Sequence, residues 1–196
     1  DGDTLATLSI DERPIIPNMM AEFGAMSAYF QPDDVVLKWL EGRAQRPFTP
    51  LYPDEGAHYD AHYTLNVAEL EPLVALPHQP DHVRSLSDVV GTPIQQAFVG
   101  TCTGGRYEDL AMVADVVRGQ KLRARLLIIP ASSEVTLQAL RSGVLADLLE
   151  AGASVNTPGC GPCMGNHLGV PAVGEATIST GSRNFRGRMG TAEADV

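Results

Sequence analysis

The sequence predicts an α/β protein whose second half forms a parallel sheet. Residues 96–100 are predicted to form a short apolar strand, and the near-continuous apolar run over residues 125–130 is typical of a strand that is buried on both faces. An amphipathic helix is predicted after each run, over residues 107–118 and 134–150. Because strands that alternate with helices form a parallel sheet covered by helices, we expect a three-layer α/β/α domain over residues 91–196.

Residues 1–90 have a different composition, with many Pro, Asp, His and Tyr residues. We expect helices over residues 20–30 and 33–40. Asp33 suits the start of the second helix, where a carboxylate meets the positive end of the helix dipole.

The rest of this first region is rich in breakers. Residues 43–63 are predicted to be a loop, and the punctuated stretch with Pro72, Pro77 and Pro80 is predicted to be a connection. We therefore expect residues 1–90 to be part of a second α/β domain followed by a proline-rich connection. His78 and His82 are assigned to that connection.

The second half can be predicted in more detail. Ser132 or Ser133 is expected to cap the helix over residues 134–150, and Gly152 is expected to end it. Short strands are predicted over residues 154–157 and 175–179. The long helix is expected to bury Leu137, Leu140, Val144, Leu145 and Leu148.

All three cysteines lie in Gly-bearing loops that follow predicted strands. Cys102 follows the first strand of the sheet, and the pair Cys160 and Cys163 follows a later one. Ligands of parallel sheets gather at the carboxyl ends of the strands, so one site is expected there. Three thiolates suit a [4Fe-4S] cluster with one iron that lacks a protein ligand. Such an iron is a Lewis acid, which favours catalysis over electron transfer.

Other interpretations of the three thiols remain open at this point. The Cys160–Cys163 pair could be a redox disulfide, or zinc could be bound with the help of His167. A structural disulfide is not expected, because the cysteine-poor, acidic composition indicates a reducing, cytoplasmic location.

The net charge of the chain is −10, from 24 acidic and 14 basic residues. Nucleic acids and anionic membranes attract basic surfaces, so neither is an expected partner. No apolar run is long enough to span a bilayer.

Four segments of the chain form an ordered set of motifs: NMMAEFGA (residues 18–25), CTGGRYEDL (102–110), PGCGPCMG (158–165) and SRNFRGRMG (182–190). In this order they resemble the successive signatures of the aconitase superfamily. The pattern most resembles the C-terminal half of the large subunit of 3-isopropylmalate dehydratase or of homoaconitase.

This resemblance implies a [4Fe-4S] hydro-lyase. Such a lyase isomerises a hydroxy di- or tricarboxylic acid by dehydration and rehydration. The expected substrate is 3-isopropylmalate, and the expected pathway is leucine biosynthesis, a branch of amino-acid biosynthesis. Homoaconitase or another dehydratase of the family is the alternative, and an iron-responsive regulatory binding module is a further one. The resemblance assigns Cys102, Cys160 and Cys163 as the ligands of the metal cluster.

The resemblance also implies roles for five other residues. Glu22 would be catalytic, while Arg183, Arg188, Asn18 and Ser182 would bind substrate. Guanidinium groups suit a dicarboxylate because they bind carboxylates with two parallel hydrogen bonds. Ser182 departs from the family pattern, which usually has Asn at this position.

The family pattern implies two partners besides the small-molecule substrate. One is a small subunit that forms the swivel domain, and the other is the N-terminal half of the large subunit. We therefore expect this chain to contain the cluster site but not a whole active site.

Overall fold

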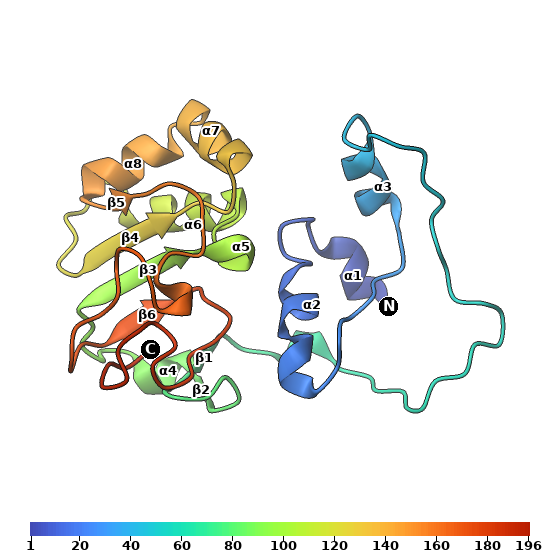
Figure 1. The fold of residues 1–196 in the computed structure, drawn as a ribbon, viewed down its shortest axis with the longest axis horizontal. Coiled ribbons are helices and arrows are strands. Elements are labelled where there is room, and N and C mark those ends of the chain that lie inside the picture. Colours follow the sequence, from blue (N-terminus) through green and yellow to red (C-terminus); the bar gives the residue numbers. More distant parts are fainter. The chain divides into compact units, whose positions relative to one another are not determined.

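The computed structural model describes residues 1–196 and contains two compact units, Asp1–Glu71 and Pro72–Val196 (Figure 1). The sequence predicts a boundary after residue 90, whereas the structure assigns residues 72–90 to the second unit. No helix of the chain has both the length and the apolar character needed to cross a bilayer.

The first unit contains short helices joined by long loops. Its elements are α1 (Asp3–Thr7), α2 (Ile15–Met19), η1 (Met20–Phe23), α3 (Asp34–Leu40) and η2 (Val67–Glu69). The helix predicted over residues 20–30 is wrong: η1 is a 3₁₀ turn that stops at Gly24, whose φ of 74° is left-handed. The helix predicted over residues 33–40 is confirmed, and Asp33 caps it by accepting the Val36 N–H.

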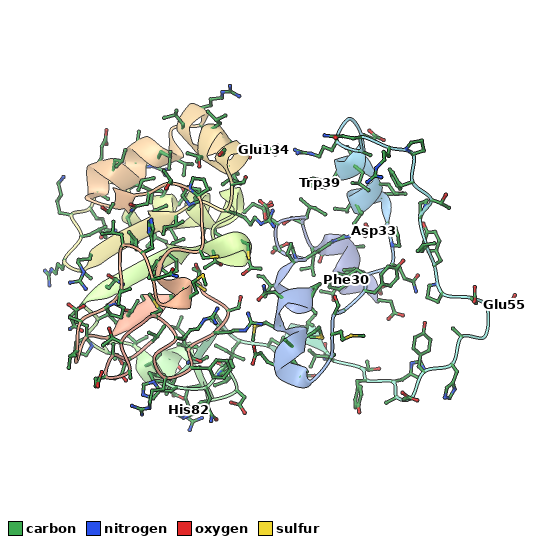
Figure 2. All side chains as sticks on the ribbon, in the orientation of Figure 1. Phe30, Asp33, Trp39, Glu55, His82 and Glu134 are labelled. Atoms are coloured by element: carbon green, nitrogen blue, oxygen red, sulfur yellow. The ribbon has the colours of Figure 1, made fainter.

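Arg13 is the only buried residue of the first unit. Its guanidinium donates to both carboxylate oxygens of Asp33 at 2.8 Å and to the carbonyl oxygens of Leu5 and Leu8. The hydrogen bonds from Arg13 hold the pKa of Asp33 at about 2, well below its usual range. A polar clamp thus takes the place of an apolar core in this unit (Asp33 is labelled in Figure 2).

The second unit begins with a small hairpin. Strands β1 (Leu73–Ala75) and β2 (Val83–Ser85) pair antiparallel, and α4 (Leu86–Val89) follows them. The prediction of a plain connection here is therefore wrong. Pro72 and Pro77 flank β1 without interrupting it, so the strand keeps its backbone hydrogen bonds.

The main sheet has four parallel strands in the order β5-β4-β3-β6. They are β3 (Gln96–Gly100), β4 (Arg125–Ile129), β5 (Ser154–Val155) and β6 (Thr177–Ser179). In this register Phe98 of β3 lies between Leu127 of β4 and Ser179 of β6. The predicted α/β class with a parallel sheet is confirmed.

Three helices pack on one face of this sheet: α6 (Tyr107–Val117), α7 (Ser133–Arg141) and α8 (Val144–Ala151). The single helix predicted over residues 134–150 is wrong, because Gly143, with a left-handed φ of 87°, separates α7 from α8. Ser132 caps α7 as predicted, by accepting the Val135 N–H.

The break also changes which side chains of this region are buried. Leu137 and Leu140, which we expected in the core, are 49% and 61% exposed. The predicted burial is confirmed for Val144, Leu145 and Leu148 of α8.

The opposite face of the sheet is covered by irregular chain and by η3 (Gly161–Met164). Phe98, Leu127, Ile129 and Met189 form its core, with Cys163 packed against them. The layer on this face is therefore a 3₁₀ turn and the C-terminal segment in place of regular α-helices. The second cysteine loop (residues 158–165) therefore lies against this face of the sheet.

Candidate functional site

The predicted site residues of the second unit lie in segments that follow strands at the carboxyl edge of the parallel sheet. Cys102 follows β3 directly, and Ser182 and Arg183 follow β6. Because β3 and β6 are hydrogen-bonded neighbours, the Cys102 turn and the arginine loop (residues 180–190) lie side by side. Cys160 and Cys163 follow β5, on the far side of β4.

Cys102 is exposed on a short helix, α5 (Thr101–Gly104), where the sequence predicts a loop. The preceding residue, Thr101, has a φ of 81°, which is strained for a β-branched side chain. Its Oγ1 accepts the N–H groups of Thr103 and Gly104, each at 3.3 Å. These bonds compensate the strain and fix the turn that presents Cys102.

Thr180, at the end of β6, fastens this turn to the sheet. Its Oγ1 donates to the Gly104 carbonyl oxygen at 2.7 Å and accepts the Gly100 N–H at 3.0 Å. A Cβ atom on Gly104 would lie 2.4 Å from the Thr180 carbonyl oxygen. Only glycine therefore allows α5 to approach the end of β6 this closely.

A second hydroxyl pair joins the Cys102 turn to the arginine loop. Thr103 Oγ1 and Ser182 Oγ lie 3.0 Å apart, and Thr103 is buried. This pair thus joins the residue before Arg183 to the residue after Cys102.

Cys163 lies on η3 and Cys160 directly precedes it. The Cys163 N–H donates to the Cys160 carbonyl oxygen. Cys160 is exposed and Cys163 is half-buried. A Cβ atom on Gly165 would lie 2.9 Å from the Gly190 nitrogen, and one on Gly181 would lie 3.7 Å from Cys163 Sγ. The end of η3 therefore packs closely against the arginine loop.

Arg188 places positive charge beside one of the sulfurs. Its Nη2 lies 3.9 Å from Cys163 Sγ, and its Nε is buried with no hydrogen-bond partner. A buried N–H without an acceptor costs about 1–3 kcal/mol, so this donor is built for an acceptor that the chain does not supply. An anionic group beside Cys163, such as a thiolate-bound cluster or a carboxylate, fits this donor.

All three cysteines are free thiols, so their chemistry suits an iron-sulfur cluster. However, no three His, Cys, Asp or Glu side chains of residues 1–196 are grouped closely enough to hold a metal ion. Neither the three sulfurs nor the two close cysteines with His167 form such a group, and His167 is exposed. Metal ligands are commonly drawn together as the metal binds, so the cluster ligand set stays a prediction.

The remaining predicted residues are divided between the two units. Arg183 is half-buried in the arginine loop of the second unit. Asn18 lies in α2 and Glu22 in η1, both in the first unit. The site described above is therefore built from the second unit alone, and the roles of Asn18 and Glu22 stay predictions.

The sequence reasoning missed the residues that hold the Cys102 turn in place. These are Thr101, Thr103, Thr180 and Arg106, whose Nε donates to the Cys102 carbonyl oxygen at 2.8 Å. The hydroxyl residues on both sides of Cys102 are the signal that could have identified the first two.

Comparison of the sequence with known proteins identifies the family of the chain. Residues 1–93 and 88–195 match the aconitase family (aconitate hydratase). The chain is 44% identical to a 3-isopropylmalate dehydratase large subunit of Methanopyrus kandleri, with 100% of this chain and 47% of the relative covered. It is 43% identical to a probable methanogen homoaconitase large subunit of Methanosarcina mazei, with 96% and 48% covered. A 3-isopropylmalate dehydratase large subunit of Halothermothrix orenii is 42% identical, with 100% and 47% covered. The chain spans about half the length of these curated relatives.

Proposed function

Because the chain belongs to the aconitase family, we propose that it is the cluster-bearing part of a [4Fe-4S] hydro-lyase. The proposed reaction is the isomerisation of a hydroxy di- or tricarboxylic acid by dehydration and rehydration. One observation supports this proposal most directly: the arginine loop contacts both cysteine-bearing segments. The Thr103–Ser182 pair joins this loop to the Cys102 turn, and the contact of Arg188 with Cys163 joins it to η3.

Cys102, Cys160 and Cys163 would hold the cluster. When bound, a cluster with one iron that lacks a protein ligand supplies a Lewis acid for a hydroxyl group, which is otherwise a poor leaving group. The unpartnered Arg188 Nε supports an anionic group in this place.

The chain's own residues would bind and orient the substrate. Arg183 and Arg188 are proposed to bind its carboxylates, because guanidinium groups offer paired N–H donors. Ser182 would keep the arginine loop at a fixed distance from the Cys102 turn. Asn18 is proposed to contact substrate through its amide, and Glu22 is proposed as the carboxylate that holds a proton near the departing hydroxyl.

We propose 3-isopropylmalate as the substrate, because several similar relatives are named 3-isopropylmalate dehydratase large subunit. The homoaconitase reaction is the second candidate, since a relative of almost equal identity is named a homoaconitase large subunit.

The proposed partners are a small subunit and the other half of a large subunit. The relatives are named large subunits, and the chain matches about half of their length. The first unit buries no apolar side chain, and it exposes large ones such as Phe23, Met26 and Tyr63. Such a surface is typical of a unit that is covered by another polypeptide.

The experiment is an activity assay of the assembled enzyme. This chain, reconstituted with iron and sulfide, is combined with polypeptides that supply the other half and the small subunit of a relative. We expect turnover of 3-isopropylmalate with a higher kcat/KM than that of the homoaconitase substrate. The reverse order would assign the homoaconitase reaction, and no turnover of either acid by a fully loaded assembly would contradict the proposed activity.

A further inference from the structure

A cavity of about 410 Å³ lies in the second unit, between the hairpin connection and the arginine loop. It is lined by Pro77, His78, Gln79, His82 and Arg186, none of which has a role in the proposed reaction. We propose that this cavity binds a small oxyanion, of the carboxylate, phosphate or sulfate class. Figure 2 labels His82 at the edge of the second unit.

The two walls of the cavity are fastened to each other. The buried Asn184 donates from Nδ2 to the Leu76 carbonyl oxygen at 2.8 Å. Next to this bond, the backbones of His78 and Phe185 form a bridge. The residues before His78 and those before Arg186 are therefore held in a fixed relation, as a preformed binding site requires.

Arg186 provides a permanent positive charge at the cavity. Its Nη1 donates to the Ala192 carbonyl oxygen at 3.3 Å, which orients the exposed guanidinium group. The remaining N–H groups of the guanidinium are available for a ligand. Their planar arrangement matches two oxygens of a carboxylate, phosphate or sulfate.

Each histidine of the cavity uses one ring nitrogen within the protein. His82 Nδ1 lies 3.2 Å from the Pro77 carbonyl oxygen, which can only accept, so this nitrogen carries the hydrogen. His78 Nε2 lies 3.5 Å from the Asp195 carboxylate and carries its hydrogen for the same reason. The second nitrogen of either ring can then donate to an anion only when the ring is protonated.

Arg186 lines the cavity, and its positive charge favours an anion there.

The chain as a whole would repel anions, since its net charge is −10. A cavity with one guanidinium and two imidazoles is thus a local exception. Anion binding in this cavity should therefore depend on these side chains and not on the overall charge of the chain.

The test is calorimetric titration of the 196-residue chain with sulfate. We expect sulfate to bind about tenfold more weakly to R186Q, because this variant loses the charge-assisted hydrogen bonds of the guanidinium group. R123Q is the matched control, since Arg123 is exposed and lies outside the cavity. This variant removes the same charge and should bind sulfate like the parent chain.

Competition with phosphate and malonate then shows which oxyanion the cavity prefers. The proposal is overturned if sulfate does not bind, or if R186Q and R123Q weaken binding equally. Since the titration needs no cluster, its failure is independent of the proposed reaction.

Discussion

Thr103 Oγ1 lies 3.0 Å from Ser182 Oγ, across a separation of 79 positions in the sequence. This pair joins the residue after one candidate cluster ligand to the residue before one candidate substrate arginine. Its strength can be measured directly, because Thr103 is buried and a valine of nearly the same shape can replace it.

We expect T103V to lower the free energy of unfolding by about 1–2 kcal/mol, since Ser182 loses its partner and Thr101 Oγ1 loses a neighbour. Urea denaturation of the second unit measures this change. T92V is the control, because the Thr92 hydroxyl makes an exposed, local bond to the Val89 carbonyl oxygen. Equal effects of the two variants would show that the Thr103–Ser182 bond contributes nothing beyond a surface contact.

Gly104 is predicted to tolerate no side chain. In G104A the new Cβ would meet the Thr180 carbonyl oxygen at 2.4 Å, so α5 must move away from β6. We expect a loss of about 2–3 kcal/mol in thermal or urea unfolding, as for an overpacked core. G159A is the matched control in the second cysteine loop. A Cβ there meets nothing within 4 Å, so this variant should stay within about 0.5 kcal/mol of the parent.

Glu175 should make the protein acid-sensitive. Arg125 donates to both of its carboxylate oxygens, and the Ala172 N–H donates to Oε2. These bonds lower the pKa of Glu175 from 4.5 to about 2. The folded-state pKa is depressed, so the stabilisation is fully present above about pH 5 and is lost as the pH falls towards 2.

Unfolding of the parent chain and of E175Q as a function of pH checks this assignment. The two curves should differ above pH 5 and converge towards pH 2. E193Q removes an exposed carboxylate of the same terminal region and should follow the parent at every pH. A constant difference between parent and E175Q down to pH 2 would contradict the role of the ion pair.

Arg13 is predicted to hold the first unit together. R13L would leave Asp33 without its partner and would remove the hydrogen bonds to Leu5 and Leu8. Since this unit has no apolar core, we expect a loss of about 3 kcal/mol, seen as faster amide hydrogen exchange in residues 1–40. Exchange in residues 96–155 should not change. R46L, at an exposed position, should leave both regions unaffected.

The sequence predicts the parallel sheet well, because apolar runs and caps are local signals. Ser132 and Gly152 lie at the helix ends where the pattern indicates them. The break at Gly143 was missed, since the apolar spacing runs on through it even though the helix does not. The hairpin was missed as well, because Pro72 and Pro77 were interpreted as breakers when they only flank a strand.

In the candidate site, too, some residues can be predicted from the sequence and others cannot. Cysteine spacing and the resemblance of the four segments identify the chemically distinctive residues. Thr180 and Thr103 are common residue types, and their partners lie 76 to 80 positions away in the sequence. Only the folded sheet, with β3 beside β6, shows that these threonines fix the position of Cys102.

The central claim is that three thiols from two loops hold one cluster, and metal analysis after anaerobic reconstitution tests it most directly. We expect about four iron and about four acid-labile sulfide per chain, with visible absorption typical of an iron-sulfur cluster. Replacing Cys102, Cys160 or Cys163 singly by serine should abolish this loading. Undiminished iron in C102S would contradict the claim, because the cluster would then be held without the loop that follows β3.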